Sequence, residues 1–478
     1  MMKRWGLYYD GQWHEAATHH VLRSPIDGEP LAEIGLASEE QAERAIESIA
    51  RAAESFARQP AFERARLLGR IAEKLEARRE EFARAICLEA AKPITAARAE
   101  VHRAIHTFAL SAEEVNHLFG ELLPLDLLPD VPSSSGTPMR MALTRRVPVG
   151  PVLAIPAFNF PLNLPAHKIA PALAAGCPVL LKPAPQTPWT ALLLTEVIHE
   201  VGAPAGCFAL LPCTNEVAER LVRDERFALL TFTGSDRVGW HLKNICGKKR
   251  TLLELGGNGA VVVAEDADVD HAVGRCLFGA FVYAGQVCVG VQRIYVVEPV
   301  YEAFVEKFTG AARKLRPRDP RDEQSLLGPM ITEAAAARAQ AWVREAVAAG
   351  AEVIAGGERD GAWMEPTVLI NVTPEMRVVC QEVFAPVVTV SSVPDWEAGL
   401  AEANDPVYGL QAGIFTGNVH RVLQAFDRLR SGGIVVNDVP TFRAEHVPFG
   451  GMNQSGQGRE SVRHTMEAMT EWKALIFP

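Results

Sequence analysis

Short apolar runs alternate with helical patterns along most of the chain. The N-terminal segment WGLYYDGQW is typical of short strands joined by turns. Ser38 and Gln41 form a capping box in front of apolar residues at helical spacing, which predicts a helix that begins there. Pro60 indicates the first turn of a second helix, and we expect the chain to stay helical to about residue 118.

From residue 152 onward, apolar strands and helices follow one another regularly. The strands are expected at 152–155, 179–181, 208–211 and 229–232, each followed by a helix. A second block with the same alternation extends from about 255 to 440. This order predicts an α/β fold with two doubly wound parallel-sheet domains, because helices must cover both faces of a parallel sheet.

Two stretches depart from the alternation. Residues 120–136 are rich in proline and contain three consecutive serines, which indicates a linker, and residues 138–148 alternate like an extended strand or arm. The stretch from Gly450 to Pro478 is expected to be rich in loops. It ends in the apolar EWKALIF, a strand suited to the edge of an oligomer.

Composition limits the classes of function. Of the 478 residues, 48% are hydrophobic and 22% are charged, and the net charge is −10, so we expect neither a nucleic-acid nor a membrane partner. The eight cysteines form no C-x-x-C pair, and no export signal is visible, which predicts reduced thiols and a cytoplasmic protein. His102 and His106 lie four residues apart without a third ligand, so we expect no metal site.

Three local patterns are candidates for chemistry. Gly234 and Ser235 follow a strand and open a helix, where backbone amides bind phosphate, although an ordinary N-cap has the same pattern. Cys288 lies at a turn between a helix and a strand. It could act there as a nucleophile or be an ordinary small buried residue. Glu254 ends an apolar strand, where burial would raise its pKa toward that of a general base unless the side chain leaves for solvent.

These motifs occur together, in order, in a known family. The sequence closely resembles the aldehyde dehydrogenase superfamily, and most closely its members that act on lactaldehyde, succinate semialdehyde or, without phosphorylation, glyceraldehyde 3-phosphate. The resemblance rests on IPAFNFPL, LLKPAPQTP, FTGS, LELGGN, GQVC, EVFAPV and PFGG. It implies a Rossmann-type cofactor domain, a catalytic domain and a β oligomerisation arm.

The resemblance also implies the reaction and the residues that perform it. Cys288 would be the nucleophile, Asn159 would stabilise the oxyanion, and Glu254 would activate the water that hydrolyses a thioester. A base at position 254 favours hydrolysis over transfer to coenzyme A. The cofactor, NAD or NADP, would be bound by Ile155, Pro156, Lys182, Gly234, Ser235, Glu382 and Phe384.

Some positions differ from the common family pattern. Phe158, Tyr283 and Asn258 replace a frequent Trp, Asn and Lys, and we expect Phe158 and Tyr283 on the substrate side. Pro185 stands where members that prefer NAD often have Glu, which leaves NADP admissible. Arg443 and His446 precede PFGG and could bind a small anionic or hydroxylated aldehyde, or could be an ordinary surface pair.

The resemblance divides the chain into three parts. Residues 1–125 and 147–254 would form the cofactor domain, 255–445 the catalytic domain, and 126–146 with 446–478 the arm and tail of a homodimer or homotetramer. A catalytically silent structural or binding protein on the same fold is the alternative, although it would be expected to lose Cys288, Glu254 or Asn159. A thiol esterase side activity would use Cys288 and Asn159 on activated esters.

Overall fold

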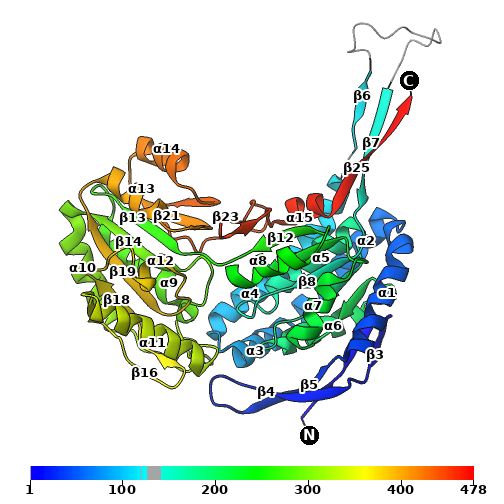
Figure 1. Cartoon of the computed structure of the whole chain (residues 1–478), viewed down its shortest axis with the longest axis horizontal. Helices are drawn as coiled ribbons and strands as arrows, with labels where there is room; N and C mark the ends of the chain where they lie inside the picture. Colours follow the sequence, from blue (N-terminus) through cyan, green and yellow to red (C-terminus); the bar gives the residue numbers. More distant parts are fainter. Residues whose placement is uncertain (1, 119, 126–140, 478) are drawn as a thin grey trace.

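Two large sheets organise the computed structural model, which describes residues 2–118, 120–125 and 141–477 (Figure 1). The central five strands of the first sheet are parallel, and both edges are antiparallel. Its eight strands lie in the order β24 (Gly456–Gln457), β12 (Arg250–Glu254), β11 (Leu229–Thr233), β8 (Val152–Ile155), β9 (Val179–Leu181), β10 (Phe208–Leu210), β2 (Leu7–Tyr9) and β3 (Gln12–His14).

Helices cover both faces of the first sheet because successive residues of its buried strands point to opposite sides. Val152 and Ala154 of β8 face one core, whereas Leu153 and Ile155 face another. The first core contains α2 (Ala61–Ala77), α3 (Arg79–Ala90), α4 (Ile94–Glu114), α5 (Asn163–Ala175) and α6 (Pro188–Glu200). The second contains α1 (Glu39–Ala57), α7 (Asn215–Arg223) and α8 (Asp236–Ile245).

The second sheet repeats this arrangement. Its strands lie in the order β15 (Glu352–Ala355), β18 (Thr367–Ile370), β19 (Val387–Val393), β14 (Val291–Val297), β13 (Gly259–Val263), β21 (Gln411–Phe415) and β22 (Gly433–Val436). One face packs on α9 (Val269–Phe281) and α10 (Glu298–Ala312), the other on α13 (Trp396–Asn404) and α14 (Val419–Arg428). At the end of the sheet formed by β15 and β18 lie α11 (Glu333–Ala348) and α12 (Arg377–Cys380). The predicted α/β fold with two doubly wound sheets is confirmed.

A three-stranded sheet extends away from the body as an arm (Figure 1). It consists of β25 (Thr470–Phe477), β7 (Met141–Pro148) and β6 (Leu122–Pro124), and β25 pairs with β7 along its whole length. Residues 126–140, which belong to the predicted linker and arm, lie outside the described residues. A smaller sheet near the N-terminus contains β1 (Arg4–Trp5), β4 (Thr18–Arg23) and β5 (Pro30–Leu36).

The C-terminal stretch is more ordered than its sequence predicts. Instead of loops alone, it contains α15 (Val462–Ala468), which begins at an N-cap where the Ser461 hydroxyl accepts a hydrogen bond from the backbone of His464. Val462 and Met466, four residues apart, are buried in the first core. Strand β24 completes the edge of the first sheet beside β12, so this stretch packs on the body as well as forming the arm.

No helix in the described part of the chain is long and apolar enough to cross a membrane. The domain boundaries given above stay predictions.

Candidate active site

Four neighbouring parallel strands of the first sheet end at the same edge, and each leads to a candidate residue. Thr233 of β11 lies opposite Glu254 of β12, and Phe232 lies opposite Ile155 of β8. The next strand, β9, ends directly before Lys182. The carboxyl ends of parallel strands are where α/β proteins bind their ligands.

A cavity of about 1310 Å³ opens at this edge and is lined by residues that follow strands of both large sheets. Twelve of the fourteen candidate residues from the sequence line it: Ile155, Pro156, Phe158, Asn159, Lys182, Gly234, Ser235, Glu254, Cys288, Glu382, Phe384 and Arg443. The two that do not are Tyr283 and His446. The fold therefore gathers residues separated by almost 300 positions around one space.

Cys288 lies in the turn between the short helix η2 (Val282–Gly285) and β14. It is one of two cysteines that are only partly buried, and the other six are fully buried. The pKa of the Cys288 thiol is raised to about 12, mainly by burial and secondly by the negative charge of Glu382. The positive charge of Arg443 lowers this pKa. The thiol reaches the cavity but is protonated near neutral pH.

Asn159 follows β8 and is buried beside the cysteine loop. Its side-chain amide donates a hydrogen bond of 3.0 Å to the carbonyl oxygen of Gln286, two residues before Cys288. An amide nitrogen carries two N–H donors, so one stays available for a group bound at the sulfur.

Glu254 ends β12 and is 5% exposed. Within the described part of the chain, neither of its carboxylate oxygens has a hydrogen-bond partner. The pKa of Glu254 is raised well above its usual range, mainly by burial and secondly by the negative charge of Glu460. The positive charges of Arg443 and Lys168 lower it. An isolated carboxyl group with a raised pKa is suited to proton transfer with water.

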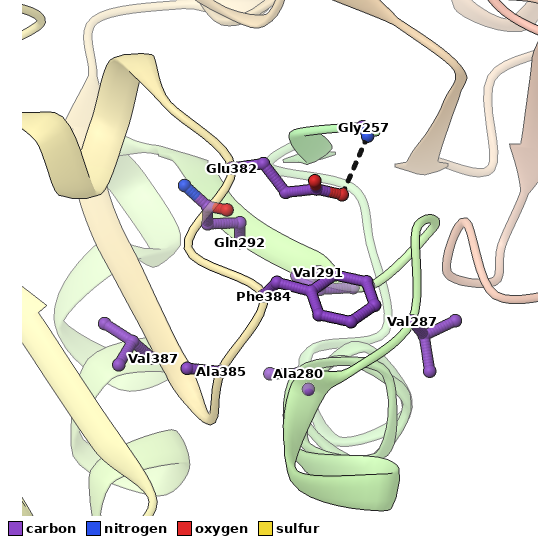
Figure 2. Close-up of a pocket in the computed structure, with 11 residues that line it drawn as sticks. Gly257, Ala280, Val287, Val291, Gln292, Glu382, Phe384, Ala385 and Val387 are labelled. Carbon is purple, nitrogen blue, oxygen red and sulfur yellow. Dashed lines mark hydrogen bonds between the residues drawn. The ribbon is translucent and has the colours of Figure 1, made fainter. Parts of the chain in front are cut away.

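The two glycines after Glu254 allow the two halves of the site to approach closely. A Cβ atom at Gly256 would lie 2.3 Å from a carboxylate oxygen of Glu382, and one at Gly257 would lie 2.3 Å from the carbonyl oxygen of Cys288. The backbone N–H of Gly257 donates a hydrogen bond of 3.0 Å to Glu382, as Figure 2 shows. Larger residues would push both groups out of the cavity.

Glu382 and Phe384 lie on the loop between α12 and β19 (Figure 2). Burial raises the pKa of Glu382 to about 8. Phe384 meets Phe158 edge to face, with ring centroids 5.9 Å apart. The expected nicotinamide-side residues are therefore held by contacts to both sheets.

At the other end of the cavity, Lys182 and the start of α8 provide positive charge. Lys182 is buried, and burial lowers the pKa of its ammonium group. Ser235 is the N-cap of α8 and accepts a hydrogen bond from the backbone of Val238. Pro185 is exposed and also lines the cavity, as do the carboxylate residues Glu219 and Asp236.

Tyr283 and His446 lie elsewhere. Tyr283 is 1% exposed, and its ring lies 4.7 Å from the ammonium nitrogen of Lys92, inside the protein. His446 is exposed on the segment before PFGG. Neither side chain lines the cavity that contains Cys288 and Glu254.

A group of buried and partly buried charged residues lies beside this cavity, and of these only Arg443 was predicted from the sequence. Arg103 of α4 lines the cavity and donates a hydrogen bond of 2.6 Å to Glu445, which also bonds the buried His167. Arg443 donates to Glu460, which also pairs with Lys168. Arg103 carries no local signal, because only the packing of α4 brings it to the site.

The whole chain matches one family. The family model "Aldehyde dehydrogenase family" matches residues 13–475. The chain belongs to the aldehyde dehydrogenase family. It is 40% identical to a 3-sulfolactaldehyde dehydrogenase of Priestia aryabhattai over 476 residues, 99% of this chain and 98% of the relative.

Two solved structures have the same fold throughout. Aldehyde dehydrogenase 21 of Physcomitrella patens, in complex with its product succinate, superposes with a TM-score of 0.96 at 38% identity and covers 100% of this chain and 98% of that one. An NADP-dependent glyceraldehyde-3-phosphate dehydrogenase of Bacillus halodurans, complexed with NADP, superposes with a TM-score of 0.95. Its sequence is 31% identical, and the alignment covers 99% of each chain. The expected cofactor class, NAD or NADP, agrees with the second structure.

Proposed function

We propose that this aldehyde dehydrogenase oxidises a small aldehyde with an anionic group at its other end to the carboxylic acid, with NAD or NADP, and releases the acid by hydrolysis. The observation that carries the proposal is that Cys288, Asn159 and Glu254 line one cavity together with Arg103 and Arg443. The three reacting groups supply a nucleophile, a hydrogen-bond donor and a base.

The cavity suits a dinucleotide. Lys182 and the N-terminus of α8 match phosphate and ribose groups at one end, and the Glu382 carboxylate matches ribose hydroxyls near Cys288. Gly234 could not bear a Cβ atom, which would lie 2.5 Å from the Phe232 ring, so the backbone at this helix start stays open to a phosphate. When bound, the nicotinamide supplies the hydride acceptor for the oxidation.

The chain's own residues perform the remaining steps. The Cys288 thiolate attacks the aldehyde carbon and forms a C–S bond, and the resulting oxyanion accepts hydrogen bonds from the Asn159 amide and the Cys288 backbone N–H. Loss of hydride from that carbon leaves a thioester on Cys288. Glu254 then takes a proton from water, whose oxygen attacks the thioester carbon, and the C–S bond breaks to release the acid and the thiolate.

The anionic group of the substrate is inferred from charge. Arg103 and Arg443 line the cavity, and each is paired with a glutamate that does not line it, Glu445 and Glu460 respectively. The Nε atom of Arg443 has no hydrogen-bond partner in the described structure. A carboxylate or sulfonate, as in sulfolactaldehyde or succinate, would accept hydrogen bonds from the guanidinium groups of these two arginines.

An aldehyde panel tests the proposal. With succinate semialdehyde, 3-sulfolactaldehyde and butanal, reduced cofactor measured at 340 nm should show kcat/KM for the anionic aldehydes at least about tenfold above that for uncharged butanal, which corresponds to about 1.4 kcal/mol. Equal use of butanal would contradict an anionic substrate. Absence of reduced cofactor with every aldehyde, NAD and NADP alike, would favour a silent protein on this fold.

Arg103→Met tests the arginine without touching the reacting groups. The loss of one charge-assisted hydrogen bond, about 1.5–3 kcal/mol, should lower kcat/KM for the anionic aldehydes about 10- to 100-fold and leave butanal nearly unchanged. Arg98→Met, on the same helix but paired with Glu80 and Glu323 at the surface, is the matched control.

A further inference from the structure

A buried ion pair next to the active site contacts both loops that carry reacting groups. Lys92, which follows α3, donates a hydrogen bond of 2.5 Å to Glu100 of α4, and both side chains are almost fully buried. A buried ion pair is costly unless further hydrogen bonds satisfy it. The remaining contacts of this pair show where those bonds go.

Glu100 fixes the turn that presents Asn159. Its second carboxylate oxygen accepts hydrogen bonds from the backbone N–H groups of Leu162, at 2.9 Å, and Asn163, at 3.1 Å. These groups start α5, only three and four residues after Asn159, and would otherwise lack partners at the helix N-terminus. A charged acceptor at this end also complements the helix dipole.

Lys92 contacts the same turn and the cysteine loop. Its ammonium nitrogen lies 3.6 Å from the ring centroid of Phe160, the residue after Asn159, and 4.7 Å from that of Tyr283, five residues before Cys288. Such cation–π contacts are strong when desolvated. One ammonium group therefore holds the two loops at a fixed separation.

Hydrogen bonds through Gln286 connect the cysteine loop to the Asn159 side chain. The backbone N–H of Gln286 donates to the carbonyl of Tyr283, and the carbonyl of Gln286 accepts the Asn159 side-chain amide. The Gln286 side chain is anchored in turn by the backbone N–H of Ile331. The orientation of Asn159 thus depends on the relative position of the two loops that Lys92 contacts.

We infer that Lys92 and Glu100 are positioning residues for the oxyanion hole, which hold the Asn159 amide toward the oxygen that forms next to Cys288. This inference rests on the proposed function. The pair lies behind the loops and does not line the cavity, so it acts only through Phe160, Tyr283 and the start of α5. This role also explains why Tyr283 is buried: its ring makes a cation–π contact with Lys92.

The test uses a reaction that needs no cofactor. The full-length protein is mixed with p-nitrophenyl acetate, and the rate and amplitude of the nitrophenol burst report acylation of Cys288 and the fraction of competent sites. Lys92→Met and Glu100→Gln should lower the burst rate constant at least about tenfold while the amplitude is kept, since full loss of an oxyanion donor costs about 100- to 1,000-fold.

Two controls separate positioning from folding. Glu89→Gln is matched, because Glu89 is equally buried and accepts the backbone N–H groups of Trp189 and Thr190 at the start of α6, instead of the N–H groups that follow Asn159. This variant should lower the thermal unfolding midpoint but not the burst rate constant. Alkylation of Cys288 by iodoacetamide, which forms no oxyanion, should stay within about twofold of the wild-type rate in the Lys92 and Glu100 variants.

The outcomes are distinguishable. A burst amplitude that falls with an unchanged rate constant would mean that Lys92 and Glu100 only support folding, and would overturn the inference. Burst rates that fall equally in Glu89→Gln would overturn it as well. A wild type that releases no nitrophenol, or release that survives Cys288→Ala, would instead overturn the nucleophile assignment on which the inference rests.

Discussion

At the scale of single residues, the site combines a nucleophile and a base whose pKa values are both raised by burial. Burial is the largest cause of the raised pKa of Cys288 and of that of Glu254. The proposed reaction needs the thiolate of Cys288 and the carboxylate of Glu254, so both pKa values bear on its pH dependence. Two predictions belong to this scale.

Glu254→Gln should allow one turnover and then stop. The amide keeps the size of the side chain but cannot take a proton from water, so the thioester on Cys288 should accumulate. A stopped-flow trace at 340 nm should show a burst of reduced cofactor of about one equivalent per site without a steady phase. Cys288→Ala should give no burst, and loss of the burst in Glu254→Gln would assign Glu254 an earlier step.

The reactivity of Cys288 should rise with pH through the neutral range. Because its pKa is raised to about 12, the thiolate fraction below that value increases about tenfold for each pH unit. Iodoacetamide alkylation of Cys288 in the free enzyme, followed by peptide mass spectrometry from pH 7 to pH 10, should show this slope. A plateau below pH 8 would mean that a neighbouring group stabilises the thiolate.

At the scale of elements, the loops after β8, β9, β11 and β12 contribute different chemical groups to the cavity, and we expect the loop between β9 and α6 to set the cofactor preference. Lys182 and Pro185 both line the cavity there. A proline cannot accept a hydrogen bond from a ribose 2′-hydroxyl through its side chain, nor can it repel a 2′-phosphate.

We therefore expect NADP to be used at a rate within about tenfold of that with NAD, a difference of about 1.4 kcal/mol. Pro185→Glu should shift the preference toward NAD, because a carboxylate gains a charge-assisted hydrogen bond of about 1.5–3 kcal/mol to the hydroxyl. The measurement is kcat/KM for each cofactor at a saturating aldehyde concentration. Exclusion of NADP by about a thousandfold in the wild type would show that a different group fills the 2′-phosphate space.

At the scale of the whole molecule, we expect the arm to contact another copy of the chain. Seven of the eight residues of β25 are exposed, among them Trp472, Leu475, Ile476 and Phe477. Strand β22 is the outer edge of the second sheet and offers a further set of unpaired backbone groups. Exposed apolar side chains on a projecting strand are costly in water.

Sedimentation velocity at micromolar concentration should therefore show a homodimer or homotetramer. Ile476→Asp, which adds a charge on the exposed arm, should weaken association at least about tenfold. Lys473→Gln, on the same strand, changes the net charge by the same single unit and is the matched control. A monomeric wild type would contradict this use of the arm.

The sequence by itself determined the features that arise from neighbours along the chain. The alternation of short apolar strands with helices fixed the two doubly wound sheets, because burial on both faces imposes that pattern on local sequence. The capping box at Ser38 and the N-cap at Ser235 form where predicted, because an N-cap depends on only three or four consecutive residues. The ordered family motifs also marked the residues that line the cavity.

The tertiary structure alone decided which residues support that cavity. Arg103 meets Glu445 across 342 positions of sequence, and no local pattern reports such a contact. The same holds for Lys92 and Glu100, whose role depends on the loops they contact, and for Tyr283 and His446, which have suitable chemistry but lie outside the cavity. Periodicity and capping encode where a side chain lies on its own element, whereas the packing of elements decides what that side chain meets.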